Sequence, residues 1–215
     1  MDLNNKKTIN GWAMYDWANS VYSLVITSAI FPIYYNSVTT GANGSDTVIF
    51  FGLEIINTVL YSYALSFSFL VVAAILPILS GIADYACNNK FFLKIFMYIG
   101  SLSCIGLFFF TGKNVEWAIV CSVFASIGYS GGLVFYDAFL PEIASEDQFD
   151  RVSAKGYAMG YIGSVLLLIV NIIMIQKPAW FGLADSGLAS RLSFLMVGLW
   201  WIGFSQITYN RLPDN

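Results

Sequence analysis

The stretch IINTVLYSYALSFSFLVVAAILPILSGIA, residues 55–83, decides the fold class, because its 29 residues include no Asp, Glu, Lys or Arg. A helix rises about 1.5 Å per residue, so about 20 residues cross a hydrocarbon core of about 30 Å. Five further charge-free stretches occupy residues 17–45, 95–112, 117–136, 156–176 and 192–210. These stretches are continuously apolar rather than alternating, and a helix satisfies its backbone polar groups within the segment. The sequence therefore predicts six transmembrane helices.

The charges around these stretches set the expected boundaries of the helices. We place the helices near residues 11–36, 56–82, 92–111, 116–138, 155–176 and 190–209. Residues 37–55 are rich in Gly, Ser, Thr and Asn and are predicted to be a solvated loop. The other connections are short, so we expect an all-α membrane protein in which residues 1–215 form a single six-helix transmembrane bundle.

The composition excludes several classes of protein. Apolar residues make up 58% of the chain and charged residues only 11%, against about 25% charged residues in soluble domains. This excludes an ordinary water-soluble enzyme, and a net charge of −3 excludes a nucleic-acid partner. The chain has no His, and its cysteines (Cys87, Cys104 and Cys121) are too few and scattered for a disulfide framework or a zinc site. We expect no metal and no cofactor.

The basic residues predict the orientation in the bilayer. With the N-terminus inside, the cytoplasmic segments carry Lys6, Lys7, Lys90, Lys94, Arg151, Lys155 and Arg211. The outer segments then carry only Lys113, Lys177 and Arg191. This excess of seven over three favours cytoplasmic termini, and an even number of spans agrees with it. We expect a multi-pass protein of the bacterial cytoplasmic membrane, or of a vacuolar membrane in a eukaryote.

The first predicted helix carries a polar stripe. At about 100° per residue, Asp16, Asn19, Ser20, Ser23 and Thr27 fall within a sector of about 100°. An Asp at the centre of a membrane helix costs about 2.5–3.5 kcal/mol on insertion scales, so such a stripe favours a surface that faces a cavity or a partner. Two alternatives remain: Asp16 lies at the cytoplasmic interface, and the other residues join helices through hydrogen bonds. We select Asp16, Asn19, Ser23 and Thr27 as candidate cavity-lining residues for substrate or coupling.

The fourth predicted helix repeats this pattern. Ser122, Ser126, Tyr129, Tyr136 and Asp137 share one side of it. Asp137 comes close to the cytoplasmic end, where a solvated helix terminus is the alternative interpretation. Ser122, Ser126, Tyr129 and Asp137 join the list of candidate substrate or coupling residues that line the cavity.

The fifth predicted helix carries a row of glycines instead of a polar stripe. Gly156, Gly160 and Gly163 line one face, at the small-residue spacing that lets two membrane helices pack backbone to backbone. We predict helix packing for these glycines, with Ser164 and Asn171 beside them as possible cavity residues.

Large aromatic residues are common at both ends of the predicted bundle. Trp12 and Trp17 in the first helix and Trp200 and Trp201 in the sixth are predicted to be lipid-facing or interfacial anchors. The run Phe108–Phe110 is predicted to face lipid in the same way.

The connection between the second and third helices is charged. It reads Gly81-Ile-Ala-Asp84 and continues to Lys90. An acidic residue is the wrong charge for the negative end of a helix dipole, so some other group must compensate Asp84. We treat Gly81, Asp84 and Lys90 as a candidate gating loop.

These motifs resemble a known family. Gly81-x-x-Asp84 with Lys90 resembles the cytoplasmic loop motif of the major facilitator superfamily. The blocks GWAMYDWANSVY (residues 11–22), DAFLPEIA (residues 137–144) and SAKGYAMGYIGS (residues 153–164) resemble its vacuolar amino-acid effluxer-like (autophagy-related) branch. The resemblance covers essentially the whole chain but only the N-terminal half of the family, whose members have two six-helix halves, each built from two three-helix repeats.

The resemblance implies transport by alternating access, in which the first and fourth helices of each half line a central cavity. It also implies that Asp84 contacts the second half in one state. Two departures matter. Tyr85, Asn88 and Asn89 replace most of the motif's basic residues, which weakens the expected gating contact. The fifth helix lacks the Gly-Pro pair of antiporters, so we infer no antiport mechanism.

We therefore expect the N-terminal half of a secondary active transporter for a small solute, with amino acids as a candidate class, and not an enzyme. Its partners would be the lipid bilayer, a small-molecule substrate and a second six-helix half, supplied by a separate chain, a C-terminal part or a homodimer. One alternative is an inactive fragment or accessory membrane protein. A remote alternative is an intramembrane aspartyl protease-like enzyme with Asp16 and Asp84 as its acids, although Ala83 stands where such enzymes need Gly.

Overall fold

The structure, a computed structural model, describes residues 3–41, 43–86 and 88–213, with Asp84 and Ala86 described by their backbone alone. Within this part of the chain, six helical segments are long and apolar enough to cross a membrane. The spans in chain order are α1 (Lys6–Val21) with η1 (Tyr22–Ile30) and α2 (Phe31–Thr39), then α3 (Asn57–Ala86), α4 (Asn89–Leu107), α5 (Val115–Ala138), α7 (Phe149–Gln176) and α8 (Ser186–Tyr209). Short elements connect them: β1 (Thr47–Phe50), β2 (Leu53–Ile56), α6 (Leu140–Ile143), η2 (Glu146–Gln148) and η3 (Pro178–Phe181).

Several helices begin earlier than their charge-free stretches suggest. The side chain of Asn5 caps α1 by accepting hydrogen bonds from the backbone N–H groups of Lys7 and Thr8. Asp185 caps α8 through the N–H of Leu188, at 2.7 Å. These caps satisfy N–H groups that have no partner inside the helix. Charged residues are tolerated in such end turns because they project beyond the hydrocarbon, so the absence of charge underestimates helix length.

The segment predicted to be a solvated loop, residues 37–55, contains regular structure instead. The helix continues to Thr39, and β1 and β2 then pair antiparallel as a hairpin. Phe51 and Gly52 at its turn have φ angles of 47° and 84°, the left-handed conformations that a two-residue hairpin turn requires. The composition signalled a turn correctly but did not reveal the short strands on either side of it.

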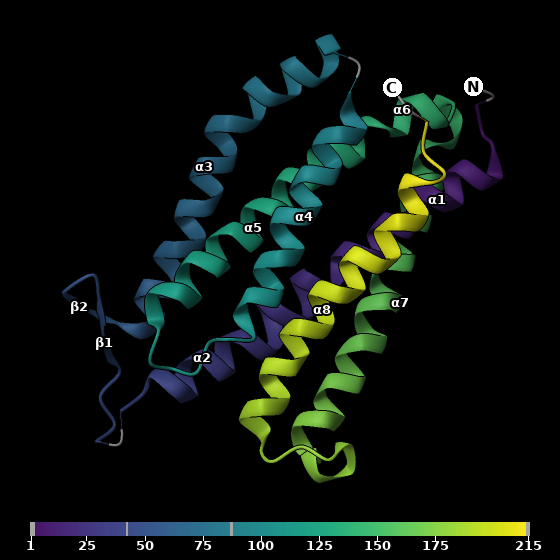
Figure 1. The fold of residues 1–215 in the computed structure, drawn as a ribbon. Coiled ribbons are helices and arrows are strands. Elements are labelled where there is room, and N and C mark those ends of the chain that lie inside the picture. Colours follow the sequence, from purple (N-terminus) through teal and green to yellow (C-terminus); the bar gives the residue numbers. More distant parts are fainter. Residues whose placement is uncertain (1–2, 42, 87, 214–215) are drawn as a thin grey trace.

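The six spans pack as two related sets of three. The first span contacts the fifth and sixth (α7 and α8), while the fourth span, α5, contacts the second and third (α3 and α4). The third and sixth spans, α4 and α8, pack against each other. Exchanging the first three spans with the last three leaves this pattern unchanged, as two three-helix repeats require. Both ends of the chain lie at the same end of the bundle (Figure 1).

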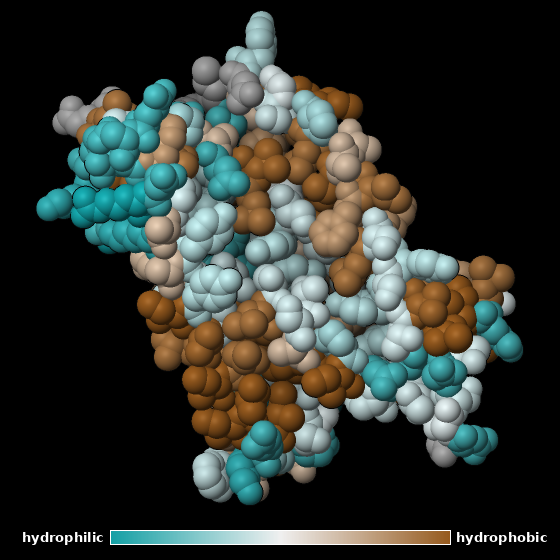
Figure 2. Space-filling view, turned by 180° about the vertical axis from the view of Figure 1, so that it is seen from behind, coloured by the Kyte–Doolittle hydropathy of each residue, from teal (hydrophilic) through white to brown (hydrophobic). Residues whose placement is uncertain are grey.

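Hydrophilic and hydrophobic side chains are distributed over the surface as expected of a protein embedded in a bilayer. Hydrophilic side chains gather at the ends of the molecule, and hydrophobic ones cover much of the surface between them (Figure 2). The helix α3 is the most exposed span, since only 6% of its most apolar 18-residue stretch is buried inside the bundle.

The tryptophans differ from their predicted role. Trp12 and Trp201 are only 2% and 0% exposed, so the expectation that they anchor the protein in lipid or at the interface is wrong. Trp201 fills the space beside Gly100, where a Cβ atom would lie 2.4 Å from its ring. Trp17 and Trp200 stack on each other with their ring centres 5.4 Å apart. Aromatic rings of this size are buried here because neighbouring glycines leave room for them.

The residues of the run Phe108–Phe110 also differ from one another in exposure. Phe109 is 61% exposed, whereas Phe110 is completely buried. The ring of Phe110 packs against Tyr34 and Tyr35 of α2. The expectation of a lipid-facing run is therefore wrong for Phe110.

Candidate functional site

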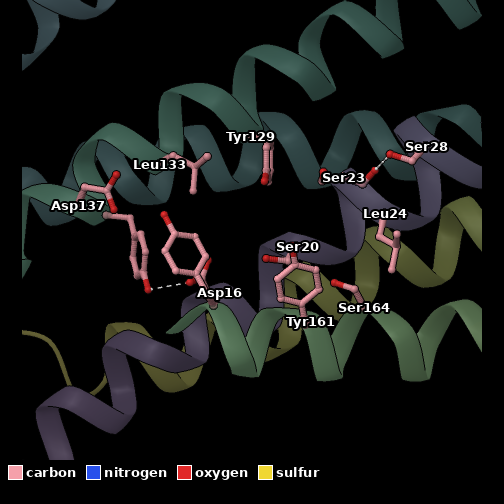
Figure 3. A pocket seen from close by; sticks show the side chains of 12 residues that line it. Asp16, Ser20, Ser23, Leu24, Ser28, Tyr129, Leu133, Asp137, Tyr161 and Ser164 are labelled. Carbon is pink, nitrogen blue, oxygen red and sulfur yellow. Dashed lines mark hydrogen bonds between the residues drawn. The ribbon is translucent and has the colours of Figure 1, made fainter. Parts of the chain in front are cut away.

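A polar pocket of about 360 Å³ opens between the first, fourth and fifth spans. Its walls come from α1 and η1, α5 and α7, with α5 on one side and α7 on the other in Figure 3. Two carboxyl groups and eight hydroxyl groups line it, and the lining includes no basic side chain. The lining residues are Asp16, Ser20, Ser23, Leu24, Ser28, Tyr129, Leu133, Tyr136, Asp137, Tyr157, Tyr161 and Ser164.

Asp16 forms the most enclosed part of this lining, with only 5% of its surface exposed. The hydroxyl group of Tyr136 donates a hydrogen bond to its Oδ2 atom at 3.2 Å. Trp12 holds Tyr136 in place, because the two rings stack with centres 4.2 Å apart and Trp12 Nε1 donates to the Tyr136 carbonyl at 2.9 Å. Tyr15 stacks on Tyr136 at 5.2 Å. The carboxyl group of Asp16 is thus fixed by a partner that is itself held by three contacts.

Two glycines of α7 make room for side chains of α1, Gly156 for the carboxyl group of Asp16 and Gly160 for Ser20. A Cβ atom at Gly156 would lie 2.8 Å from Asp16 Oδ2 and 2.8 Å from the Tyr136 hydroxyl oxygen. A Cβ atom at Gly160 would lie 2.6 Å from Ser20 Oγ. The predicted small-residue face of this helix therefore packs against α1, with Gly163 against Trp17 farther along the same seam.

Asp137 is the second carboxyl group of the pocket. It lies in the last turn of α5 and is exposed. In Figure 3 its side chain lies at the same end of the pocket as Asp16, with Tyr129 and Leu133 on the turns of α5 before it. Two acidic groups from different helices therefore face one polar space.

Four of the eight candidate cavity residues line this pocket, and four do not. Asp16, Ser23, Tyr129 and Asp137 belong to the lining. The residues placed elsewhere are Asn19, Thr27, Ser122 and Ser126.

The serines of α5 that lie outside the pocket have partners within the bundle. Ser122 donates to the Ala118 carbonyl at 2.8 Å, as Ser and Thr side chains often do in membrane helices. Ser126 accepts a hydrogen bond from Ser68 of α3 at 2.7 Å. Ser122 is therefore satisfied within its own helix, whereas Ser126 joins α5 to α3.

The first span loses its regular α-helical phase in the middle. Residues 22–30 form the π-helix η1, in which hydrogen bonds run from residue i to i+5. Such a helix has more residues per turn, so a stripe drawn at about 100° per residue falls progressively out of register beyond Tyr22. Ser28 takes the pocket-facing position that the stripe assigned to Thr27, and its hydroxyl group donates to the Ser23 carbonyl at 2.8 Å. Asn19, the member of the stripe next to Ser20 in α1, is completely buried and does not line the pocket.

The fifth span contributes more to the pocket than its sequence pattern suggested. Tyr157 and Tyr161 line it and were not among the candidate cavity residues. Their i, i+4 spacing within a membrane span, on the flank of the glycine face, is the signal that would have found them. Ser164 also lines the pocket, whereas Asn171 is completely buried outside it.

The candidate gating loop is only partly described. Lys90 is 8% exposed, and its Nζ atom donates to the Leu212 carbonyl at 3.0 Å. Gly81 lies in α3, with open space where its Cβ atom would be. The side chain of Asp84 and the whole of Cys87 lie outside the described residues. The structure therefore places Lys90 beside the C-terminal segment and leaves the predicted contact of Asp84 as a prediction.

Among the residues that the structure describes, no group of three or more Cys, Asp, Glu or His side chains is arranged to hold a metal ion. Cys104 and Cys121 are buried packing residues, 0% and 5% exposed.

Comparison with known proteins places this architecture in a family. The sequence model of the family described as "Vacuole effluxer Atg22 like" matches residues 4–215. The chain belongs to the Atg22-like family. A Bacillus subtilis relative, named "Uncharacterized MFS-type transporter YxiO", is 36% identical over 200 residues, which cover 91% of this chain and 44% of the relative.

Fungal members of the Atg22-like family are more distant. "Autophagy-related protein 22-1" of Penicillium rubens is 23% identical over 81% of this chain and 39% of its own length. "Autophagy-related protein 22-2" of Aspergillus fumigatus is 23% identical over 98% of this chain and 50% of its own length. The chain therefore spans half or less of these relatives. No solved structure gives a significant match.

Membership of the Atg22-like family, together with six apolar helices, identifies a multi-pass membrane protein of a transporter family. The names of the relatives are those of a transporter and of autophagy-related proteins, and none of those three names is that of an enzyme.

Proposed function

We propose that this chain is the N-terminal six-helix half of a secondary active transporter, which moves a small solute by alternating access, with amino acids as the candidate class. The observation that carries the proposal is the pocket between α1, α5 and α7 with Asp16 buried in its wall. An acidic side chain inside a membrane bundle is costly and usually marks a substrate or ion pathway. The family relationship supports the same conclusion.

The chemistry of the lining favours a solute with an ammonium group. Asp16 and Asp137 supply acidic groups, and the rings of Tyr129, Tyr157 and Tyr161 supply aromatic faces and hydroxyl groups. Carboxylates and aromatic faces both attract an organic cation. An amino acid carries such a group at one end, while its carboxylate would find only hydroxyl groups and no basic partner among the described lining residues. We propose that a second half supplies that partner.

The exposure of the pocket supports a second half. Tyr157 and Tyr161 are 66% and 71% exposed although they lie within a membrane span and line a polar pocket. Hydroxyl and carboxyl groups facing acyl chains would be poorly solvated. A second six-helix half, as a C-terminal part, a separate chain or a second copy, would cover them and close the cavity. Asp84 would then contact that half from the end of α3.

The orientation belongs to the same proposal. The excess of Lys and Arg in the segments at the end of the bundle where the termini lie supports cytoplasmic termini. The pocket would then open toward the cytoplasm or the opposite side in alternation, as the two halves rock about it.

The test is transport by this chain co-expressed with a second six-helix half and reconstituted in liposomes. Labelled amino acids are screened first as a mixture and then singly. We expect Asp16→Asn to lower the flux at least about tenfold, because a hydrogen bond to a charged group contributes about 1.5–3 kcal/mol and about 1.4 kcal/mol corresponds to a factor of ten.

Asp46→Asn is the matched control, because Asp46 is exposed in the connection before β1 and makes the same change of charge. Membrane insertion of both variants is measured by their yield and by gel filtration. Wild-type flux in a properly inserted Asp16→Asn variant would contradict the role of Asp16. A complex that folds but moves no solute would favour the alternative of an inactive or accessory protein.

A further inference from the structure

A second polar cavity is separate from the polar pocket that contains Asp16. It lies on the other side of the contact between α1 and α7 and shares no lining residue with that pocket. It has a volume of about 380 Å³ and lies where the N-terminal turns of the two helices meet. Among the residues that the structure describes, three basic side chains line it and no acidic one does. The lining consists of Asn4, Lys6, Ile9, Asn10, Gln148, Arg151, Val152 and Lys155.

The basic side chains of this cavity are held close to one another by the fold. Asn4 donates a hydrogen bond to Ser145 at 2.8 Å, which ties the segment before α1 to the segment before α7. Lys155 donates to Asn10 across the seam. Asp147 and Asp150 are close in sequence, but neither lines the cavity. Three like charges are thus brought together around a hollow, an arrangement that an anion would stabilise.

The surface of α7 beyond this cavity is apolar. Ile162 and Leu166 follow Lys155 at spacings of 7 and 11 residues, so all three lie on one face of the helix. Ile162 is 55% and Leu166 49% exposed. Leu166 lies about 16 Å from Lys155 along the axis, at about 1.5 Å per residue.

That face leads into an apolar groove between α7 and α8. The groove has a volume of about 410 Å³. Its lining is apolar apart from one indole nitrogen and consists of Leu166, Leu167, Val170, Met196, Leu199 and Trp200. A cationic hollow at the end of the bundle is therefore continuous, along one helix face, with an apolar groove at membrane depth.

We propose that this flank binds one anionic phospholipid from the leaflet on the side of the chain termini. Its phosphate lies among Lys6, Arg151 and Lys155, and an acyl chain follows α7 past Ile162 into the groove beside Leu166. Basic pockets between membrane helices suit anionic headgroups. The apolar groove favours a lipid over a soluble phosphate, because a free anion would use only the basic end. The proposal does not depend on the transported solute or on a second half.

The test is lipid binding by the purified protein in detergent, measured by native mass spectrometry. Phosphatidylglycerol and phosphatidylcholine with the same acyl chains compete for the wild-type protein, and we expect one molecule of phosphatidylglycerol to be retained preferentially. Each basic residue near a membrane surface contributes about 1 kcal/mol of attraction, so Lys6→Gln with Arg151→Gln should weaken phosphatidylglycerol binding roughly thirtyfold.

Lys113→Gln with Lys177→Gln is the matched control, because both lysines are exposed and both lie in connections at the other end of the bundle. This pair changes the net charge equally and should leave binding unchanged. Equal losses in the two double variants, or equal retention of the two lipids by the wild-type protein, would overturn the proposal. The second comparison needs no variant, so it holds even if a variant fails to fold.

A further arm separates a lipid from a soluble anion. Inorganic phosphate is titrated into the wild-type protein, and thermal unfolding is followed with and without phosphatidylglycerol. We expect phosphatidylglycerol to raise the melting temperature and inorganic phosphate alone to leave it unchanged. Stabilisation by inorganic phosphate that phosphatidylglycerol does not exceed would identify a soluble anion as the occupant and overturn the assignment to a lipid.

Discussion

Two glycine-bearing seams hold the bundle together, and they use the same small residue for different purposes. In the seam between α4 and α5, a Cβ atom at Gly128 would lie 2.3 Å from the backbone nitrogen of Gly100 and 2.7 Å from the Phe96 carbonyl oxygen. In the seam between α1 and α7, a Cβ atom at Gly156 would meet the side-chain oxygens of Asp16 and Tyr136. At Gly128 the first seam brings two backbones together, whereas at Gly156 the second leaves space for an acidic side chain.

This difference separates stability from function. Close backbone approach in membrane helices gains van der Waals contact that lipid cannot supply. Space beside Asp16 adds no such contact and instead allows a carboxyl group and its tyrosine partner to fit between two helices. Substitutions in the first seam should therefore lower stability most, and those in the second should lower transport more than stability.

The largest effect is expected from Gly128→Ala. The three atoms nearest to the added methyl group are backbone atoms, which cannot rotate away as a side chain can, so α4 and α5 must separate. Overpacking of this kind costs about 3 kcal/mol. Unfolding in mixed micelles, followed by circular dichroism, measures the loss.

Gly203→Ala is the control for this change, because Gly203 lies in α8 with open space around its Cβ position. It should unfold as the wild-type protein does. Equal stability of the Gly128 and Gly203 variants would mean that the α4–α5 contact is looser than the structure indicates.

Gly156→Ala should have a smaller effect on stability and a marked effect on transport. The new methyl group would meet the far ends of Asp16, Tyr136 and Trp12, which can shift by a few tenths of an ångström. We expect a cost of about 1 kcal/mol in unfolding free energy. Displacing the carboxyl group by a few tenths of an ångström should reduce flux about tenfold, which is less than the roughly hundredfold loss that a misplacement of about 1 Å can cause. Flux in liposomes and unfolding are measured on the same preparation, and undiminished flux would show that Asp16 does not need this space.

The number of transmembrane spans could be predicted from the sequence, for a physical reason that applies to every span. Charged groups are expelled from hydrocarbon, so charge-free stretches such as residues 55–83 mark the helices directly. Helix ends were less predictable, because caps such as Asn5 and Asp185 extend helices past the last charge-free residue. The hairpin of β1 and β2 was missed because turn residues do not reveal short strands beside them.

The first span's share of the pocket was predictable only as far as the start of its π-helix. Asp16 and Ser23 follow from a period of 3.6 residues, but farther along η1 Ser28 rather than Thr27 enters the lining. Which helix faces a given polar side chain is a tertiary property, and polarity alone does not encode it. Ser126, which points to α3, is an example.

Ser126→Ala gives the smallest expected effect and tests that last distinction. Its hydroxyl group accepts the 2.7 Å hydrogen bond from Ser68, which joins α5 to α3. Hydrogen bonds between membrane helices contribute about 0.6 kcal/mol on average, so Ser126→Ala and Ser68→Ala should each lower stability by about that amount and, combined, by little more. Neither should change flux, because neither side chain lines the pocket. Ser68→Ala is the internal control. A loss of flux in Ser126→Ala but not in Ser68→Ala would mean that Ser126 lines the cavity, as its place on the polar side of α5 predicted.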